Sequence, residues 1–370
     1  MERLPRWADV ILVPFINLVL AFFVAGLVVL AIGENPLDAI YFMLKGALGS
    51  TRGIGYTLYY ATNYIFTGLA VAVAFHARMF NIGGEGQAAI SGIGAAIVML
   101  AVPWPHWALA LPFAILGAGL FGAAWAFIPA WLQARRGSHI VITTIMFNFI
   151  GAALLGYLLN GILKSPDTQN AETLAFPAAA ALPTAQQMLA PLGIAFNKSA
   201  PLNVSFILAL ACAVGVWFLL WRTRLGYEIR AFGHSESAAE YAGISATRII
   251  VIAMLISGAL AGMLSINVVV GEQERLIKEF VEGAGFVGIA VALMGRSHPF
   301  GIVLAALLFG MLNQGGFELL WEMPTVSKEM VLVIQALIIL FTGALNYMVQ
   351  QPVERLFAYL RILRAKKGRG

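Results

Sequence analysis

The chain has 370 residues, of which 60% are hydrophobic and 11% are charged, with a mean hydropathy of +0.85 and a formal charge of +5. A soluble domain usually carries about 25% charged residues, so this composition excludes a water-soluble fold and predicts one membrane domain over residues 1–370. The basic residues stand in short clusters between apolar runs, which favours a role in membrane topology over nucleic-acid binding.

Ten apolar runs are candidates for membrane spans, because a helix needs about 20 apolar residues to cross the hydrocarbon. We therefore expect an all-α integral membrane protein with about ten transmembrane helices. The third, eighth and ninth runs are short or broken by glycine, which predicts discontinuous helices. The first run is longer than the roughly 7 to 15 apolar residues of a signal peptide, so we expect an uncleaved span. The runs are 10–32, 56–76, 86–103, 107–132, 139–160, 203–221, 249–270, 281–295, 300–317 and 330–349.

The distribution of basic residues predicts the orientation. With the amino terminus in the cytoplasm, sixteen of the 23 lysines and arginines fall in inside segments, so both termini are expected inside. The largest outside segment, 161–202, contains five prolines and predicts an irregular periplasmic loop with room for a short surface helix. On the inside, we expect a cytoplasmic loop over 222–248 and a basic cytoplasmic tail over 350–370.

The stretch 79–87, MFNIGGEGQ, follows the second predicted span on the cytoplasmic side. Its glycines, Gly83, Gly84 and Gly86, permit a sharp turn or an unwound segment. Such a turn holds Glu85 close to an apolar zone, where an ionisable group is costly and indicates function. The alternative is an ordinary helix-to-helix turn with a solvated glutamate.

The inside loop 222–248 contains signals for a short helix. Ser237 and Glu240 have the spacing of a capping box, Ser235 is a second possible cap, and Gly243 can close the helix in a left-handed conformation. We expect about two helical turns outside the membrane, where they could dock into a groove of a partner. The alternative is a solvated linker.

Small and polar residues inside the spans indicate packing more often than ligand binding. The run 283–288 matches a dinucleotide fingerprint but lacks the required strand, so we interpret it, like 258–262, as close helix packing. Buried amides need hydrogen-bond partners on other helices or in a wet pathway. Asn63 and Asn148, nearest the middle of their spans, are the best pore candidates among Asn63, Tyr64, Asn148, Asn267, Asn313, Gln314, Gln335 and Asn346.

No sequence motif predicts catalysis by this chain. The phosphate-binding pattern Gly-x-x-x-x-Gly-Lys-Ser/Thr is absent, as are Gly-x-Ser-x-Gly and His-Glu-x-x-His. The five histidines lack the short spacing of a metal site, so we expect no metal. Cys212 is the lone cysteine and can form no intrachain disulfide.

Three stretches resemble permeases of the ribose and nucleoside class of bacterial ABC importers. They are 80–87 (FNIGGEGQ), 230–244 (RAFGHSESAAEYAGI) and 292–301 (ALMGRSHPFG), and the resemblance runs from about residue 10 to 350. The form of the first stretch is similar to the nucleoside branch. The resemblance implies a type II ABC importer-like permease fold in the bacterial cytoplasmic (inner) membrane.

The resemblance also implies the partners. These are a second related permease chain forming a heterodimer, cytoplasmic ABC ATPase subunits that bind ATP and magnesium, and an extracytoplasmic substrate-binding protein, with no cofactor in this chain. By analogy, a coupling helix inserts into the ATPase. Its residues are His234, Ser235, Glu236, Ser237, Ala238, Ala239, Glu240, Tyr241, Ala242 and Gly243.

Nucleosides are uncharged, so aromatic and amide side chains with few charges suit their pathway. A dense charged patch over 272–282 is expected outside, and we interpret its Arg275 and Lys278 as a docking site for the binding protein. Three alternatives stay open: the same machine importing a simple sugar such as ribose, an ATP-independent facilitator, and a membrane-embedded transferase acting on a lipid carrier. The candidate pathway residues are Tyr60, Asn63, Tyr64, Glu85, Phe147 and Asn148.

Overall fold

The computed structural model describes residues 5, 8, 12–341, 351–355 and 357. Over these residues the chain consists of helices and loops, and its only extended pairings are two isolated bridges, Glu172 with Ile277 and Thr184 with Asn203. The prediction of an all-α chain is confirmed there. Residues 342–350 of the predicted last span and most of the predicted basic tail lie outside the described residues.

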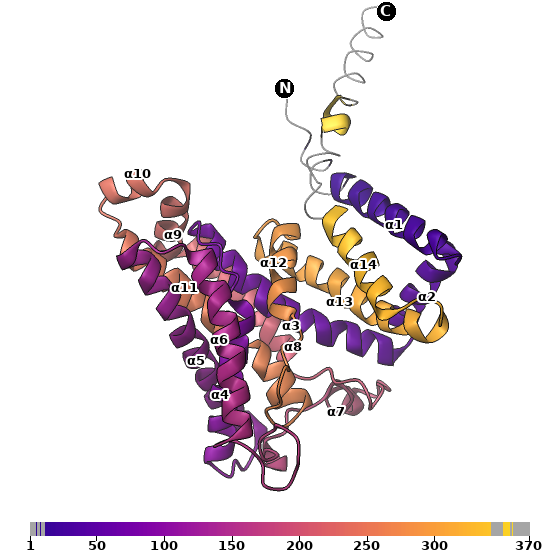
Figure 1. Cartoon of the computed structure of the whole chain (residues 1–370), viewed down its shortest axis with the longest axis horizontal. Helices are drawn as coiled ribbons and strands as arrows, with labels where there is room; N and C mark the ends of the chain where they lie inside the picture. Colours follow the sequence, from indigo (N-terminus) through magenta and orange to yellow (C-terminus); the bar gives the residue numbers. More distant parts are fainter. Residues whose placement is uncertain (1–4, 6–7, 9–11, 342–350, 356, 358–370) are drawn as a thin grey trace, which may run out of the picture. The chain divides into compact units, whose positions relative to one another are not determined.

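The chain packs as two compact units, one of residues 47–311 and the other of residues 1–46 with 312–370. The two cavities described below lie in the larger unit, whose helices are labelled in Figure 1. Its helices are α3 (Thr51–His76), α4 (Gly84–Ala101), α5 (Trp107–Arg136), α6 (Ile140–Asn160), α7 (Ala185–Leu189), α8 (Ser205–Arg222), α9 (Arg224–His234), α10 (Glu236–Tyr241), α11 (Ala246–Gly262), the π-helix η4 (Ile266–Glu272), α12 (Ala284–Met294) and the first half of α13 (Pro299–Glu322), with short 3-10 turns η2 (Ala178–Ala180) and η3 (Ala190–Leu192).

The smaller unit contains α1 (Val13–Ala31), α2 (Pro36–Leu48), the end of α13 and α14 (Lys328–Ile339). Its α2 and α13 approach each other closely: a Cβ placed on Gly315 would lie only 2.6 Å from the carbonyl oxygen of Met43. An ion pair of 3.5 Å between Lys45 and Glu322 also joins the two helices.

Seven helices of the described part are long and apolar enough to cross a membrane: Thr51–His76, Gly84–Ala101, Trp107–Arg136, Ile140–Asn160, Ser205–Arg222, Ala246–Glu272 and Pro299–Glu322. The pair Phe15–Ala31 and Pro36–Leu48 passes the same test together but is bent by 117°, so eight spans are reached if the pair forms one. The chain is a multi-pass membrane protein, and the described residues support seven or eight spans where about ten were predicted.

The predicted discontinuous helices are corrected in part. The third and ninth predicted runs form continuous helices, α4 and α13, because their glycines pack against neighbouring backbones instead of breaking the helix. The eighth run forms only the 11 residues of α12, about 16 Å of helix, which cannot cross about 30 Å of hydrocarbon. The discontinuous helix that was predicted for the eighth run is therefore present, whereas those predicted for the third and ninth runs are not.

In the core of the larger unit, α4, α5 and α11 pack against one another through small residues. A Cβ placed on Gly94 would lie 2.4 Å from the carbonyl oxygen of Gly117, and one on Gly258 would lie 2.4 Å from that of Gly122. Helices in lipid associate through such close backbone approaches because water drives no apolar burial there. The prediction that 258–262 is a packing face is confirmed.

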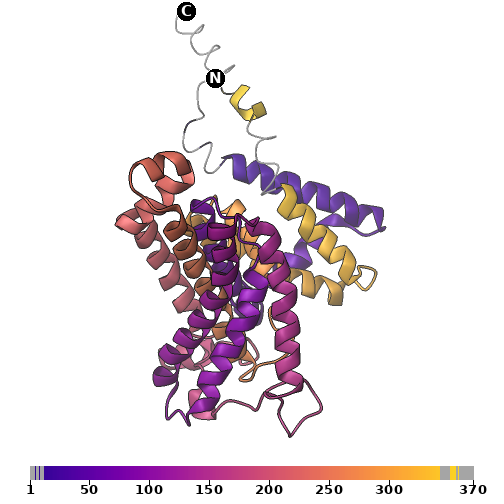
Figure 2. The ribbon, with the colours of Figure 1, turned by 60° about the vertical axis from the view of Figure 1, so that its left-hand side comes forward.

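The two ends of this unit differ in character. Helices α9 and α10 lie at one end, and the loops between α6 and α8 lie at the other, in both Figure 1 and Figure 2. The segment 161–202 is irregular, as predicted, and contains α7, whose capping box joins Thr184 and Gln187.

Candidate functional site

The stretch 79–87 is packed inside the larger unit. Asn81 and Gln87 are each 1% exposed. The Asn81 side chain donates to Gln87 Oε1 at 2.9 Å and to Ser257 Oγ at 2.8 Å, and its Oδ1 accepts from Gly83 N at 2.9 Å. The predicted sharp turn is present, and buried amides hold it against α11.

Glu85 caps the start of α12. Its Oε1 accepts a hydrogen bond from Gly283 N at 2.8 Å, and its Oε2 accepts one from Gly285 N at 2.9 Å. The first N–H groups of a helix have no partner within the helix and carry partial positive charge, so a carboxylate there is stabilising. Gly283 adopts φ +79°, a left-handed conformation that favours glycine at this position.

Helix α12 begins beside the middle of α3. A Cβ on Gly288 would lie 2.5 Å from Thr67 Cβ, and one on Gly285 would lie 2.3 Å from Glu85 N, so glycine alone permits these approaches. The prediction of close packing at 283–288 is confirmed. Half-span helices with amino termini at mid-depth form substrate sites in many transporters, because their N–H groups are directed into the protein interior.

Asn148 fixes α6 to the same turn. Its Oδ1 accepts from Gly86 N at 2.9 Å, and its Nδ2 donates to the carbonyl oxygen of Ile82 at 2.9 Å. The approach is close, because a Cβ on Gly86 would lie 2.8 Å from Asn148 Cα. One amide thus satisfies two backbone groups that the turn leaves unpaired.

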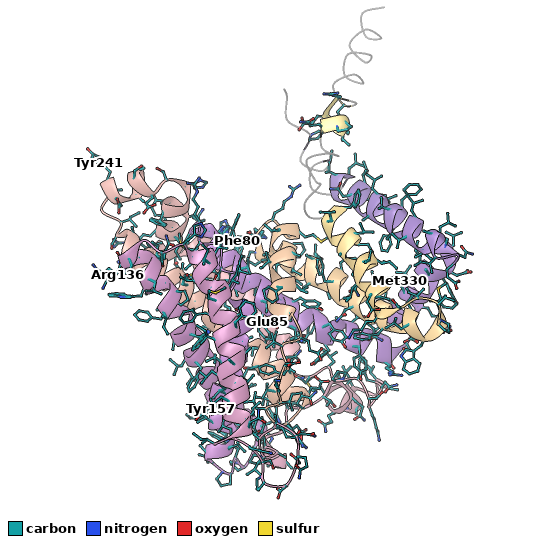
Figure 3. The ribbon with its side chains drawn as sticks, in the orientation of Figure 1. Phe80, Glu85, Arg136, Tyr157, Tyr241 and Met330 are labelled. Carbon is teal, nitrogen blue, oxygen red and sulfur yellow. The ribbon has the colours of Figure 1, made fainter. Side chains whose placement is uncertain are left out.

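A cavity of about 300 Å³, here called the half-helix cavity, opens beside these groups. Glu85 and Asn148, which were predicted for the substrate pathway, line it together with Lys278, which was predicted for docking of the binding protein. Figure 3 shows Glu85 within the body of the unit, between Tyr157 and Tyr241. The full lining is Glu85, Ala89, Asn148, Ala152, Leu155, Lys278, Glu279, Val281, Glu282 and Gly283.

The predicted tyrosines form an aromatic face on α3. The rings of Tyr56 and Tyr60 are 6.3 Å apart, and Tyr64 meets Phe309 edge to face at 6.3 Å. Tyr64 stands one helical turn before Thr67, on which Gly288 of α12 packs, so the aromatic face lies beside α12. Tyr60 and Tyr64 are not among the residues that line the half-helix cavity.

Two predicted pathway residues lie elsewhere in the unit. Asn63 Oδ1 accepts from Asn267 Nδ2 at 2.8 Å, and Asn267 Oδ1 accepts from Ser205 Oγ at 2.6 Å and Asn203 Nδ2 at 3.1 Å. This buried network, here called the amide network, joins α3, η4 and the start of α8. Phe147 packs against Trp125, with ring centroids 5.2 Å apart.

Asn203 and Ser205 were not predicted as members of any site. Their one sequence signal is local: a short polar side chain stands just before an apolar run, as at a helix start. The Asn203 Oδ1 accepts from Ser205 N at 2.9 Å, which is a capping contact. That signal places a helix end but does not show that Asn267, far along the chain, completes the contact.

The predicted coupling segment contains a helix, α10. Ser235 caps it by accepting from Ala238 N at 3.4 Å, and Gly243 closes it with φ +81°. The predicted capping box of Ser237 with Glu240 is wrong, because Ser235, named as the second possible cap, occupies the N-cap. Tyr241 is 97% exposed at the tip of the helix (Figure 3).

The predicted docking residues have partners within the chain. Arg275 pairs with Glu172 at 3.2 Å, which ties the segment after η4 to the loop 161–202. Lys278 pairs with Glu279 at 3.4 Å beside the half-helix cavity. Arg275 is 38% exposed and Lys278 is 55% exposed, so both reach the surface as well.

Residues 53–343 match the protein family described as branched-chain amino acid transport system / permease component. The chain belongs to this permease family. It is similar to the guanosine ABC transporter permease protein NupP of Bacillus subtilis, with 34% identity over 335 residues that cover 90% of this chain and 93% of the relative. The predicted resemblance to permeases of ABC importers is thereby confirmed.

Two further relatives of this permease are equally similar. The nucleoside ABC transporter permease protein NupB of Lactococcus lactis is 34% identical, over 90% of both chains. The glucose ABC transporter permease protein TsgB13 of Haloferax volcanii is 34% identical, over 89% of this chain and 86% of the relative. The same Bacillus and Lactococcus strains have second permeases, NupQ and NupC, that are 25% and 24% identical over 69% of this chain. No solved structure matches the chain.

Proposed function

We propose that this permease carries nucleosides as one subunit of an ATP-driven importer. The observation that carries the proposal is the half-helix cavity at the start of α12, the helix that packs beside the aromatic face of Tyr60 and Tyr64. Aromatic rings stack on a flat base, and the amides and backbone groups near the start of α12 suit ribose hydroxyls. Two of the three relatives at 34% identity are named for guanosine or nucleosides.

The charge at the cavity supports an uncharged cargo. Both oxygens of Glu85 already accept backbone hydrogen bonds, and Lys278 pairs with Glu279. Glu282, the fourth charged residue of the lining, is exposed to solvent. The cavity therefore does not require a charged cargo, since each charged group has a partner within the chain or is hydrated.

The ATPase would act on the permease through α10. The exposed Tyr241 and the neighbouring polar side chains suit insertion into a groove of a separate ATPase subunit that binds ATP and magnesium. ATP-driven closure of the ATPase pair would displace α10 and shift the permease between outward and inward access. Nucleotide and cargo can shift that equilibrium only by binding the two states differently.

The second permease of the importer would be a related but different chain. This permease is more similar to NupP and NupB than to the second permeases of the same two strains. That difference supports a heterodimer in which this chain takes the position of NupP and NupB. The fold within each subunit would then be the type II importer fold.

The distribution of charge supports an orientation. The end of the larger unit that carries α9 and α10 holds Arg78, Arg136 and Arg230, and basic residues favour the cytoplasmic side. We therefore propose that α10 is cytoplasmic and 161–202 periplasmic, in a bacterial inner membrane with both termini cytoplasmic. A substrate-binding protein would dock at the periplasmic end.

The test is uptake by proteoliposomes that contain both permeases, the ATPase and the binding protein. We expect ATP-dependent uptake of labelled guanosine, and an increase of the KM of at least about tenfold in Tyr60→Ala, since a stacked base is worth about 1–3 kcal/mol. Tyr157→Ala, on an exposed tyrosine that does not line the cavity, is the control with an unchanged KM.

Import of a sugar is the second candidate, because the glucose permease TsgB13 is as similar to this chain as the two nucleoside relatives. Competition with unlabelled glucose, ribose and guanosine separates the two. Inhibition by a sugar with no effect of guanosine would assign the sugar function. Uptake without ATPase subunits would contradict the importer as a whole.

A further inference from the structure

A second, larger cavity lies at the end of the unit that carries α9 and α10. It encloses about 550 Å³, within the 300–1,000 Å³ of typical small-molecule sites, and is here called the basic cavity. Its walls come from the ends of α3, α8, α9 and α12 with the turns that follow them. The lining is Phe75, His76, Arg78, Trp221, Arg230, Gly233, His234, Leu293, Arg296 and Ser297.

The ionisable side chains that line this cavity are all basic. Three arginines and two histidines line it, and none of the ten lining residues is acidic. The acidic residue of α9, Glu228, is 7% exposed and pairs with Arg224 at 2.9 Å and with Arg248 at 4.0 Å instead. A concave surface lined by cations concentrates the positive potential and attracts anions.

Polar groups inside the cavity favour an anion over a metal. His76 Nε2 is buried and has no hydrogen-bond partner among the described residues. Across those residues no three His, Cys, Asp or Glu side chains are placed to hold a metal ion. An imidazole N–H and the guanidinium groups beside it instead form a set of donors for phosphate oxygens.

The backbone around the cavity is closely built. A Cβ on Gly233 would lie 1.9 Å from the carbonyl oxygen of His76, so α9 packs directly on the end of α3. Arg78 and Arg296 have φ +57° and +52°, in the left-handed region that favours glycine after a helix. The chain thus carries guanidinium groups at two positions where its backbone alone would favour glycine.

The rim of the cavity is apolar. Phe75 is 42% exposed and Leu293 is 45% exposed, and Trp221 lies edge-on to His76 with ring centroids 5.4 Å apart. Cations beside exposed apolar side chains match an amphiphile with a phosphate head and acyl chains. Basic pockets between helices on the cytoplasmic side of membrane proteins bind anionic lipid headgroups in this way.

We propose that the basic cavity binds a phosphate group, held by Arg78, Arg230 and Arg296. The group belongs either to an anionic phospholipid whose acyl chains lie along Phe75 and Leu293 or to a soluble phosphate ester. His234 lies in the predicted coupling segment, so the bound phosphate sits at the base of α10. This inference is independent of the nucleoside cargo.

Native mass spectrometry of the full-length chain, incubated with phosphatidylglycerol or phosphatidylcholine of identical acyl chains, tests the proposal. We expect phosphatidylglycerol to bind at least about tenfold tighter, since it is the lipid with a net negative charge. The double variant Arg78→Gly with Arg296→Gly should lose this preference by about tenfold or more, because each charge-assisted contact is removed. Glycine suits both backbone conformations, so the fold should be retained.

Arg135→Gln with Arg136→Gln is the matched control. It removes two exposed arginines at the end of α5, outside the basic cavity, and should keep the lipid preference.

If glycerol 3-phosphate displaces phosphatidylglycerol and alone raises the unfolding temperature, the phosphate comes from a soluble ester. Equal binding of the two lipids with no effect of glycerol 3-phosphate would overturn the proposal, as would a double variant that binds like wild type. Should the double variant not fold, Arg78→Gly alone is judged by the same comparison.

Discussion

Glu85 and Gly283 are 198 residues apart in the chain, and the carboxylate of the first accepts the backbone N–H of the second at 2.8 Å. The same carboxylate accepts from Gly285 with its other oxygen. One side chain at the start of α4 therefore fixes where α12 begins, and with it one wall of the half-helix cavity. Glu85 is a positioning residue for this site.

Glu85→Gln should destabilise the fold. An amide keeps one acceptor oxygen, so one N–H of α12 loses its partner, and the negative charge at the helix start is removed as well. We expect the free energy of unfolding to fall by about 1–3 kcal/mol, measured as a lower midpoint of thermal unfolding in detergent. Glu279→Gln, on an 81% exposed side chain of the same cavity, is the control and should change it by less than about 0.5 kcal/mol. Equal midpoints for the two variants would refute the capping role.

The amide network should contribute to stability and not to cargo affinity. Asn267→Ala leaves the buried Asn63 and Ser205 without a partner, so the free energy of unfolding should fall by about 1–3 kcal/mol. Asn160→Ala removes an exposed amide that donates only to the carbonyl of Gly156, and should be almost neutral. Thermal unfolding gives the first comparison. In uptake assays Asn63→Ala should leave the KM unchanged, and a KM raised as far as in Tyr60→Ala would return Asn63 to the pathway.

The ion pair of Arg275 and Glu172 permits a direct test of the docking prediction. Arg275→Glu removes this internal pair as well as a surface charge, so weaker binding alone has two explanations. The double variant Glu172→Arg with Arg275→Glu restores the pair with reversed charges. Binding-protein affinity, measured by surface plasmon resonance, should stay weak in the double variant if Arg275 docks the partner. Recovery to the wild-type affinity would show that Arg275 acts only within the chain.

Tyr241→Ala should uncouple the ATPase without affecting the fold. The side chain is 97% exposed, so its removal should change the unfolding midpoint little. An exposed aromatic at the tip of α10 is a typical interface anchor, and its loss should weaken ATPase association by about tenfold or more. Co-purification and ATP hydrolysis stimulated by the binding protein are the measurements. Tyr157→Ala, at the opposite end in Figure 3, is the control; similar results for both variants would contradict a coupling role for α10.

Most of the fold was predictable from hydropathy, because a long apolar run in lipid must form a helix to pair its backbone groups. The runs that became α3, α5, α6 and α8 were identified within a few residues. The run 281–295 was located equally well, as α12, but it was counted among the candidate spans, since hydropathy reports apolar character and not depth. What limits α12 to 11 residues is the contact of Gly285 with Glu85, which depends on a distant part of the chain.

The candidate site was predictable only in part. Glu85 was identified from the cost of placing a charge near apolar residues, and Asn148 from its central place in a span. Lys278 was assigned to the surface because its sequence neighbours are charged; it is 55% exposed, and it also lines the half-helix cavity, which the sequence did not indicate. Asn63 and Asn148 are alike in sequence terms, and only the contacts of Asn267 separate them.

Helix α12 borders both cavities. Its N-cap, Gly283, lines the half-helix cavity, and Leu293 near its other end lines the basic cavity together with the turn that follows. Eleven residues make a rod of about 16 Å, too short to absorb a displacement by bending. Any shift of this helix along its axis changes the half-helix cavity and the basic cavity together. Thermodynamic reciprocity then requires that a ligand in one cavity changes the affinity of the other cavity for its ligand. The membrane's lipid composition would in that way set how readily cargo is released.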